Sequence, residues 1–570
     1  MILIHPPVVK PSEPPAGLAA LSGALAAHGV RHTLLDANLE GMLWLLGGAP
    51  GPACQAAFKG SARRAPGRRR GADAGPNYER SEMNGEASRR RAAVDSPPEG
   101  ALNPGNCTWT RRARRRLPAN LALLRDWQGY ANIARYQTAV SEVNRVIERS
   151  APRPARLSLA DYGHDRLIPV RSGDLLYAAG HPDENIFYPC FSARLRELLE
   201  DEEADSVIGV SLNYLSQALC AFSIIGFLRK ERPRARIILG GSLIASWTGN
   251  SSGANLFEGL VDRLVSGPGE LPLLSLSGVE AKGGTTWLPS FENFPLSLYL
   301  APGPILPYAG STGCYWRRCS FCPEKAQRQP CALKPPDRAI ADLRRLVDKY
   351  RPVLIHFVDN AISPALMAAL AESPLDAPWY GFARITADLA DAEFCRRLRA
   401  SGCVMLKLGL ESGDQRVLDA LGKGVDLGTA SQALAALTAA GIATYVYLLF
   451  GVPVEDLASA RKTLDFAAAH SAFIDFLNLA VFNLPVNCEE AHSLDLRAFY
   501  EGDLSLYTDF LHPRGFGRRE VRAFLDGELK RHPAVRPILL RQPPLFTSNH
   551  APLLHMARAR FSTQRPTRRS

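Results

Sequence analysis

The second half of the chain carries six strand-plus-helix units in a row, and this repeat constrains the fold more than any other feature. From Ile305 onward, short apolar runs alternate with longer stretches of helical periodicity. Strands are expected at 305–311, 353–359, 379–385, 404–411, 443–451 and 474–482. Strands that alternate with helices form a parallel sheet, and six units are too few for a closed eight-stranded barrel. The spacing therefore predicts a partial (β/α)6 TIM-like barrel over residues 300–485.

The first part of the chain shows a second α/β pattern that is interrupted by an insertion. Strands and helices are expected at 2–4, 18–28, 33–36, 206–212, 217–229, 235–239 and 260–265. Several of these strands run into glycine loops, and the C-terminal ends of strands are where open α/β sheets bind ligands. We expect a Rossmann-like (flavodoxin-like) domain built from residues 1–46 plus 200–285.

The insertion between the two parts of this domain has two sections. Residues 47–118 are rich in Gly, Pro, Ala and Arg and poor in large apolar residues, so they predict a disordered segment. Residues 119–199 predict a helical insertion, because apolar residues recur there at three-to-four spacing: Tyr130, Ile133, Tyr136, Val140, Val143 and Ile147. Residues 486–570 are expected to form a C-terminal accessory region with a basic tail.

The net charge of +11 invites a nucleic-acid interpretation, but its distribution argues against one. Between Lys59 and Arg116 there are 15 Lys/Arg against 6 Asp/Glu, and five more basic residues lie between Arg558 and Arg569. These stretches leave the rest of the chain slightly negative, so we expect no nucleic-acid partner. No signal peptide and no long uncharged apolar run are found, which predicts no membrane partner. The 11 scattered cysteines fit a reducing compartment, and a cytoplasmic location is expected.

Three cysteines lie within nine residues, directly after the first strand of the barrel. The segment 311–324 reads Ser-Thr-Gly-Cys-Tyr-Trp-Arg-Arg-Cys-Ser-Phe-Cys-Pro-Glu, with thiols at Cys314, Cys319 and Cys322. Neighbours so close cannot pair as disulfides without strain, whereas an iron–sulfur cluster takes each thiolate through one bond. Three ligands on four irons leave one iron open for a small chelating molecule. A zinc site completed by Cys331, or chance clustering of structural cysteines, are the alternatives.

This loop resembles the cluster loop of radical S-adenosylmethionine (SAM) enzymes, in the group with Cys-x4-Cys-x2-Cys spacing. The resemblance implies a 4Fe–4S cluster on Cys314, Cys319 and Cys322 that reductively cleaves SAM to methionine and a hydrogen-abstracting 5′-deoxyadenosyl radical. It also implies an electron donor such as flavodoxin or ferredoxin.

The resemblance continues along the later strands and implies which residues bind SAM. Phe321 would contact adenine through its backbone, and the other implied SAM contacts are Arg384 (carboxylate), Glu411 and Ser412 (ribose or methionine end), Gly451 and Val452 (adenine face). An Arg suits a carboxylate, and glycine permits close approach of a flat base. The family's glycine-glycine-glutamate motif is not visible, and Asp359 and Asn360 occupy that region. The catalytic residues are unknown.

The N-terminal domain resembles the cobalamin-binding domain that precedes many radical SAM barrels. The resemblance rests on His5-Pro-Pro, on Asp36-Ala-Asn38 and on the glycine loops, and it implies a cobalamin site at Ser211, Asn213, Gly240, Gly241, Gly267 and Glu270. The cobalt-binding motif Asp-x-His-x-x-Gly is absent, so the lower face of the corrin would be open or capped by another group. A flavodoxin-like domain without a ligand is the alternative.

Together these resemblances imply a cobalamin-dependent radical SAM methyltransferase. The expected reaction is C-methylation of an unactivated carbon in a natural product or specialised metabolite, on a small-molecule or peptide substrate. A radical rearrangement, cyclisation or other group transfer without methylation is a second hypothesis. A non-catalytic cobalamin or redox sensor is a third, and fold analogy alone does not name the substrate.

Overall fold

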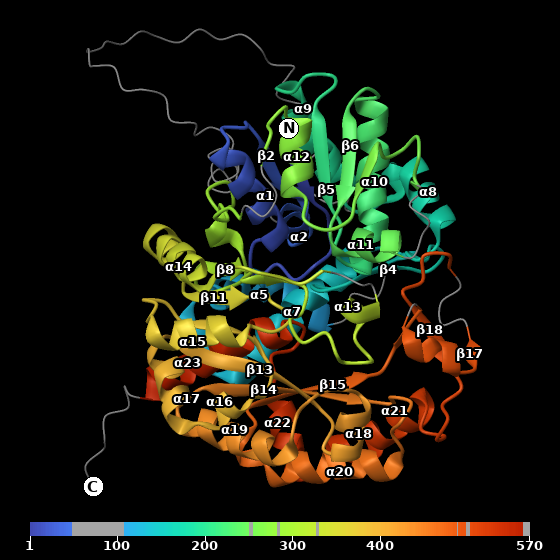
Figure 1. Ribbon diagram of the computed structural model, residues 1–570. Helices are drawn as coiled ribbons and strands as arrows, with labels where there is room; N and C mark the ends of the chain where they lie inside the picture. Colours follow the sequence, from blue (N-terminus) through green and yellow to red (C-terminus); the bar gives the residue numbers. More distant parts are fainter. Residues whose placement is uncertain are drawn as a thin grey trace, which may run out of the picture.

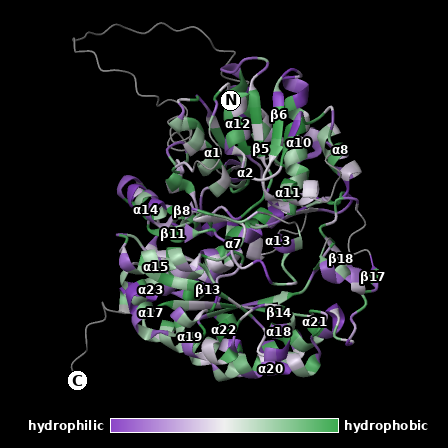
Figure 2. Ribbon diagram, viewed as in Figure 1, coloured by the Kyte–Doolittle hydropathy of each residue, from purple (hydrophilic) through white to green (hydrophobic). Residues whose placement is uncertain are grey.

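The computed structural model describes residues 1–47, 108–249, 255–281, 286–326, 330–486, 488–497 and 502–562. These residues form two α/β units, one containing the N-terminus and one made of the later strands (Figure 1). Hydrophobic residues concentrate on the strands and on the helix faces that cover them, as the colouring of Figure 2 shows. No helix in the described ranges is long and apolar enough to cross a membrane.

The N-terminal unit is a five-stranded parallel sheet in the order β2-β1-β5-β6-β7. Its strands are β1 (Ile2–His5), β2 (Thr33–Asp36), β5 (Val207–Ser211), β6 (Arg236–Gly240) and β7 (Arg263–Val265). The order reverses between β1 and β5, as in flavodoxin-like sheets, and ligands bind at that point of open α/β sheets. The structure confirms the expected Rossmann-like fold.

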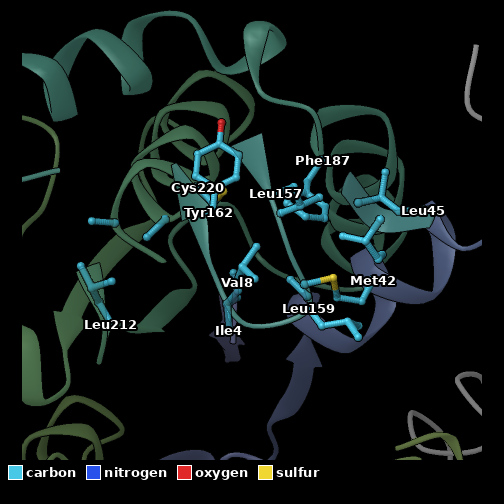
Figure 3. Packing of buried hydrophobic residues seen from close by; sticks show 14 of the residues in the cluster. Ile4, Val8, Met42, Leu45, Leu157, Leu159, Tyr162, Phe187, Leu212 and Cys220 are labelled. Atoms are coloured by element: carbon cyan, nitrogen blue, oxygen red, sulfur yellow. The ribbon is translucent and has the colours of Figure 1, made fainter. Parts of the chain in front are cut away.

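Helices cover both faces of this sheet because its strands alternate in apolar side chains. Leu3 and Leu34 pack against α1 (Ala16–Ala27) and α12 (Glu270–Leu276). The opposite face packs against α2 (Ala37–Leu45), α10 (Leu215–Glu231) and α11 (Ser242–Gly249). Figure 3 shows part of the core on this second face. Ile4 and Val8 pack there with residues of α2 and of the insertion: Met42, Leu45, Leu157, Leu159, Tyr162 and Phe187.

The helical insertion packs on the N-terminal sheet, and it begins earlier than the sequence predicted. Its elements are α5 (Thr108–Leu124), α6 (Trp127–Tyr130), α7 (Ile133–Ser150), the β3–β4 hairpin (Ala155–Leu157, Tyr162–His164), α8 (Ser172–Gly180) and α9 (Tyr188–Glu200). On α7 the buried residues include Tyr136, Val140, Val143 and Ile147, at the predicted spacing.

The prediction of disorder for 47–118 is therefore wrong at its C-terminal end. Ala113 and Leu117 are buried one helical turn apart on α5, and Arg112 donates to the buried Glu142 carboxylate at 3.0 Å. The arginine-rich composition hid this short apolar stripe, because the long cationic side chains remain at the surface. Part of the basic charge that was assigned to a linker thus lies on a folded helix. Residues 48–107 lie outside the described part of the chain.

The second unit is a six-stranded, all-parallel sheet in the order β15-β14-β13-β12-β11-β8. Its strands are β8 (Ile305–Tyr308), β11 (Leu354–Phe357), β12 (Trp379–Ala383), β13 (Cys403–Glu411), β14 (Ala443–Phe450) and β15 (Phe476–Val481). All six expected strands are present, and the sheet is the predicted partial barrel. Helices connect successive strands: α14 (Pro336–Tyr350), α15 (Pro364–Glu372), α16 (Ala387–Ala390), α17 (Ala392–Ala400), α18 (Gln415–Ala420), α19 (Leu427–Ala439) and α20 (Leu457–Ala469).

The two faces of the barrel sheet have different partners. The outer face packs against the connecting helices, while the inner face packs against the C-terminal residues Phe546, Leu553 and Leu554. The last helix, α23 (Ala551–Ser562), contacts both α6 and β13, so the C-terminal region closes one side of the barrel. The rest of this region contains α21 (Arg518–Gly527), α22 (Arg536–Leu540) and a small sheet of β16 (Leu484–Pro485), β17 (Leu496–Arg497) and β18 (Tyr507–Phe510).

Candidate functional site

The cysteine loop leaves the C-terminal end of β8 and faces the N-terminal unit. A short hairpin of β9 (Ser311–Thr312) and β10 (Ala332–Leu333) brackets the loop, which ends in the single turn α13 (Pro323–Ala326). Gly313 has φ +70°, and a Cβ there would lie 2.7 Å from the carbonyl oxygen of Pro330, so the hairpin requires glycine at this point. The base of the loop is thus closed by a tight hairpin directly before the first cysteine.

All the cysteines in the described ranges are free thiols, including those of the loop. Burial raises the pKa of Cys319 and of Cys322, and nearby Lys423 and Arg384 oppose the rise at Cys319. Cys331 lies near enough to Cys314 to interact with its charge. Among the described residues no three acidic, His or Cys side chains converge tightly enough to hold one ion. A 4Fe–4S cluster is several atoms across, so its ligands stand farther apart than those of a single ion.

A buried carboxylate ties the loop to the barrel. Asp359, which follows β11, accepts hydrogen bonds from Ser311 Oγ at 2.5 Å and from the backbone N–H of Gly310 at 3.0 Å. Burial raises the pKa of Asp359. Since both of its oxygens already accept protein donors, Asp359 serves first to fix the loop, while the neighbouring Asn360 is exposed.

Three of the predicted SAM residues gather around the cysteine loop. The guanidinium of Arg384 lies 3.8 Å from the centre of the Trp316 ring, and Glu411 forms an ion pair of 2.7 Å with Lys423. The same Lys423 ammonium lies 5.6 Å from the centre of the Phe321 ring. These side chains come from the ends of different strands and from two loops, yet they form one continuous charged and aromatic cluster.

Lys423 is a residue of this cluster that the sequence argument missed. It stands between Gly422 and Gly424, both at positive φ, and Trp316 donates from Nε1 to the Gly422 carbonyl at 3.0 Å. Arg384 donates to the Lys423 carbonyl at 2.5 Å. A Gly-Lys-Gly turn is a signal for close backbone approach, but only the fold shows that it meets the cysteine loop.

The other three predicted SAM residues have structural partners. Ser412 Oγ is fully buried, lies 3.2 Å from Thr463 Oγ1 and accepts from the Asp414 N–H, so its hydroxyl is already used. Gly451 has φ +85° and its N–H donates to Glu455 at 2.5 Å. Val452 is buried in a small apolar cluster against which Phe321 packs. Contacts from these three positions to SAM remain predictions.

A cavity of about 660 Å³ lies between the N-terminal sheet and the cysteine loop. All six residues predicted for cobalamin line it: Ser211, Asn213, Gly240, Gly241, Gly267 and Glu270. The opposite wall comes from the cysteine loop, including Thr312, Gly313 and Glu324. We call this space the first cavity. The residues predicted for cobalamin therefore face the loop that carries the three cysteines across this cavity.

The glycines of the first cavity keep it open. Gly241 has φ +110° and Gly267 φ +90°, which only glycine adopts readily. A Cβ on Gly240 would meet nothing closer than Val265 at 3.5 Å, so a large side chain there would extend into the available space. Asn213 orders the rim, because its Oδ1 accepts from the Ser242 N–H at 3.1 Å and its Nδ2 donates to Ser211 Oγ.

A second cavity of about 650 Å³ adjoins the first and reaches the inner face of the barrel. The two share part of their lining: Ala16, Gly17, Asn213 and Ser242. The lining of the second cavity includes titratable residues, among them Lys10, Glu13, His356 and Lys407. A ligand in the first cavity would therefore lie beside both the cysteine loop and a polar chamber.

Comparison with known proteins identifies the class. Residues 308–467 match the family model of the radical SAM superfamily, which covers the cysteine loop and the barrel up to α20. The chain therefore contains a region that matches a radical SAM domain. This confirms the class that the cysteine loop predicted.

A curated relative is the uncharacterized methyltransferase PH0819 of Pyrococcus horikoshii, which is 25% identical over 191 residues. That alignment covers 32% of this chain and 40% of the relative, so the chain spans less than half of the relative's length.

Among solved structures, the cobalamin-dependent S-adenosylmethionine radical enzyme OxsB has 15% identity and a TM-score of 0.45 over 58% of this chain and 60% of its own. The radical S-adenosylmethionine methyltransferase TsrM from Kitasatospora setae has 15% identity and a TM-score of 0.41, with 56% and 72% covered. At TM-scores below 0.5, these two likenesses carry no weight in the assignment.

Proposed function

We propose that this enzyme is a cobalamin-dependent radical SAM methyltransferase that transfers a methyl group to an unactivated carbon of a specialised metabolite. One observation carries the proposal: the first cavity is bounded on one side by the glycine loops of a flavodoxin-like sheet and on the other by the cysteine loop. Such an arrangement would place a corrin beside an iron–sulfur cluster. The methyltransferase relative supports the methyl-transfer part of the proposal.

The residues of the first cavity fit a corrin. The lining is largely small or apolar, with Ala16, Leu21 and Ala245 beside the glycines, which suits a large flat ring. The cavity lies at the C-terminal ends of β5, β6 and β7, next to the point where strand order reverses. No histidine is among the described residues that line it, in keeping with the absent cobalt-binding motif.

The residues around the cysteine loop fit the cluster and SAM. Cys314, Cys319 and Cys322 would hold the cluster, whose open iron would bind the amino acid end of SAM. Arg384 and Lys423 supply positive charge beside that position, and Glu411 supplies a carboxylate acceptor for ribose hydroxyls. When bound, the cluster and SAM supply the radical and cobalamin supplies the methyl carrier, while these side chains orient the ligands and exclude water.

The proposal also includes an electron donor, a cellular compartment and a route for the substrate. A low-potential donor such as flavodoxin or ferredoxin would deliver electrons to the cluster, and the free thiols suit a reducing compartment such as the cytoplasm. A small molecule or a peptide segment would enter through the second cavity. We propose neither nucleic acid nor a membrane as a partner.

Product analysis tests the proposal. Full-length protein is reconstituted anaerobically with iron, sulfide and hydroxocobalamin, incubated with SAM and a low-potential reductant, and assayed for S-adenosylhomocysteine and 5′-deoxyadenosine. Methyl donation by SAM yields the first product and reductive cleavage yields the second. The wild type should form both. Gly240→Phe should suppress S-adenosylhomocysteine but retain 5′-deoxyadenosine, whereas Cys314→Ala should lose 5′-deoxyadenosine.

The matched control is Gly173→Phe, a change at an exposed helical glycine with open space around it. It should leave both products unchanged. Wild-type protein that forms 5′-deoxyadenosine without S-adenosylhomocysteine would contradict methyl transfer and favour rearrangement, cyclisation or another group transfer. Protein that forms neither product would favour a sensor.

A further inference from the structure

Two ionisable side chains and the histidine between them form a hydrogen-bonded chain across the second cavity. Glu13 Oε1, from the loop after β1, lies 2.8 Å from His356 Nδ1 on β11. On the other side of the same ring, His356 Nε2 lies 3.1 Å from Lys407 Nζ on β13. The chain therefore joins the N-terminal unit to the inner face of the barrel, and no part of the proposed cluster, SAM or cobalamin sites uses it.

The hydrogen bonds fix the protonation of this chain. When Lys407 is charged it can only donate, so His356 Nε2 then accepts and Nδ1–H donates to the Glu13 carboxylate. A neutral imidazole meets both requirements, and burial lowers the pKa of His356. Burial likewise lowers the pKa of Lys407 to about 7, against the opposing effect of Glu13. The ammonium is thus costly to keep charged in this cavity without a further anionic partner.

Lys407 has more N–H donors than hydrogen-bond partners among the described residues. The side chain is almost fully buried, its ammonium carries three N–H groups, and the single hydrogen bond it makes among the described residues goes to His356. No carboxylate in the described ranges forms an ion pair with it. Two N–H groups of a buried cation, in a cavity of about 650 Å³, are therefore available to a ligand.

A second lysine increases the positive charge of the cavity. Lys10 donates from Nζ to Thr547 Oγ1 at 2.8 Å and likewise forms no ion pair with a carboxylate of the described chain. The two acidic residues of the lining are partly occupied: Oε1 of Glu13 accepts from His356 and Asn549 while its Oε2 has no hydrogen-bond partner among the described residues, and Asp359 holds the cysteine loop. Lys407 and Lys10 therefore both have N–H donors that no carboxylate of the described residues pairs with.

The wall beside Lys407 is aromatic. The ammonium lies 4.1 Å from the centre of the Phe382 ring, and His356 stacks on Tyr380 at 4.4 Å between ring centres. Phe382 in turn packs against Tyr447 at 4.9 Å. An apolar, flat body could lie along Phe382 with a charged group directed at Lys407.

We propose that the second cavity is the substrate site and that it recognises an anionic group of the substrate, a carboxylate or a phosphate, through Lys407 and Lys10. The inference deepens the proposed methyltransferase function and rests on it, because the cavity adjoins the first cavity at Asn213 and Ser242. Glu13 orients His356, and His356 in turn orients Lys407. Glu13 and His356 are therefore positioning residues for the lysine that binds the substrate. The competing explanation is a structural latch between the two units.

Binding of small probes tests the inference independently of turnover. The probes are phenylacetate, phenyl phosphate and the neutral phenylacetamide, titrated by calorimetry into full-length protein with its cluster reconstituted. At least one anion should bind about tenfold or more tightly than the amide, because hydrogen bonds to charged groups are the strong ones. The anion that binds more tightly identifies the group. If neither anion is preferred to the amide, the inference is wrong.

Two substitutions assign the preference to the lysines. Lys407→Met keeps most of the length of the side chain and removes its charge, so the preference for the anion should vanish while the affinity for phenylacetamide is retained. Lys10→Met should reduce the preference partially, and Lys407→Gln serves if the methionine variant does not fold. The exposed Lys530→Met is the matched control and should keep the full preference.

The outcomes separate this inference from the proposed function. A structural latch would leave the anion preference unchanged in Lys407→Met, while lowering the unfolding midpoint, and this result would overturn the inference. Failure of the methyltransferase proposal would instead appear as absent S-adenosylhomocysteine in protein that still prefers the anionic probe.

Discussion

At the scale of single residues, Glu455 shows how a buried carboxyl supports the end of a barrel strand. Its side chain is fully buried, Oε2 accepts from the Gly451 N–H, and Oε1 has no hydrogen-bond partner among the described residues. Burial raises the pKa of Glu455 from 4.5 to about 8. The folded state therefore holds a proton that the unfolded state releases between these two values.

We expect Glu455→Gln to change how stability depends on pH. In the wild type, the stabilisation from the protonated carboxyl is fully present below pH 4.5 and is lost as the pH rises through about 8. Glutamine cannot ionise, so the variant does not lose this stabilisation. Its unfolding free energy should therefore rise relative to that of the wild type as the pH increases over that range. Urea denaturation at several pH values measures the difference. The exposed Glu372→Gln should show no such trend, and a constant difference for Glu455→Gln would refute the assignment.

The sequence predicted some site residues and missed others for a physical reason. Arg384 and Glu411 could be predicted from the sequence as SAM contacts, because each lies at the end of a strand in a segment that resembles radical SAM enzymes. Lys423 and Lys407 could not, since their roles depend on partners distant in the sequence, Glu13 and His356 for Lys407 and the cysteine loop for Lys423. A lysine in a strand or a loop carries no local signal of what it will face.

At the scale of elements, we predict that three cysteines of the loop bind the cluster and that the nearby Cys331 does not. Reconstituted protein should hold about four irons with charge-transfer absorbance, and Cys→Ala at Cys314, Cys319 or Cys322 should abolish them. Cys331→Ala should retain the iron, although Cys331 lies near Cys314. Iron and sulfide analysis of the four variants decides the matter. Equal loss in Cys331→Ala would mean that the cluster has no open iron.

Helix α5 provides the second prediction at this scale, because its packing was not expected from its composition. Leu117 is 9% exposed and packs in the main core, so Leu117→Ala should lower the unfolding free energy by about 2 kcal/mol or more. Arg115→Ala on the exposed side of the same helix should change it by less than about 0.5 kcal/mol. Chemical denaturation of both variants measures this contrast. A neutral Leu117→Ala would show that α5 is not part of the core.

At the scale of the whole molecule, the two parallel sheets were foreseeable and the meeting of the two units was not. Alternating strands and helices determine parallel sheets, and all six barrel strands fell where periodicity put them. By contrast, the contact between the glycine loops and the cysteine loop depends on how two separately folded sheets dock. Neither unit's local pattern encodes the first cavity, although all six residues predicted for cobalamin line its sheet side.

The most direct test of the account is the amount of cobalt that the protein retains. Reconstituted protein is incubated with hydroxocobalamin, desalted and analysed for cobalt by mass spectrometry. The account predicts about one cobalt per chain for the wild type and for Gly173→Phe, and a several-fold loss for Gly240→Phe, whose side chain would fill the first cavity. Wild-type protein that retains no cobalt, or Gly240→Phe that retains as much as the wild type, would contradict it.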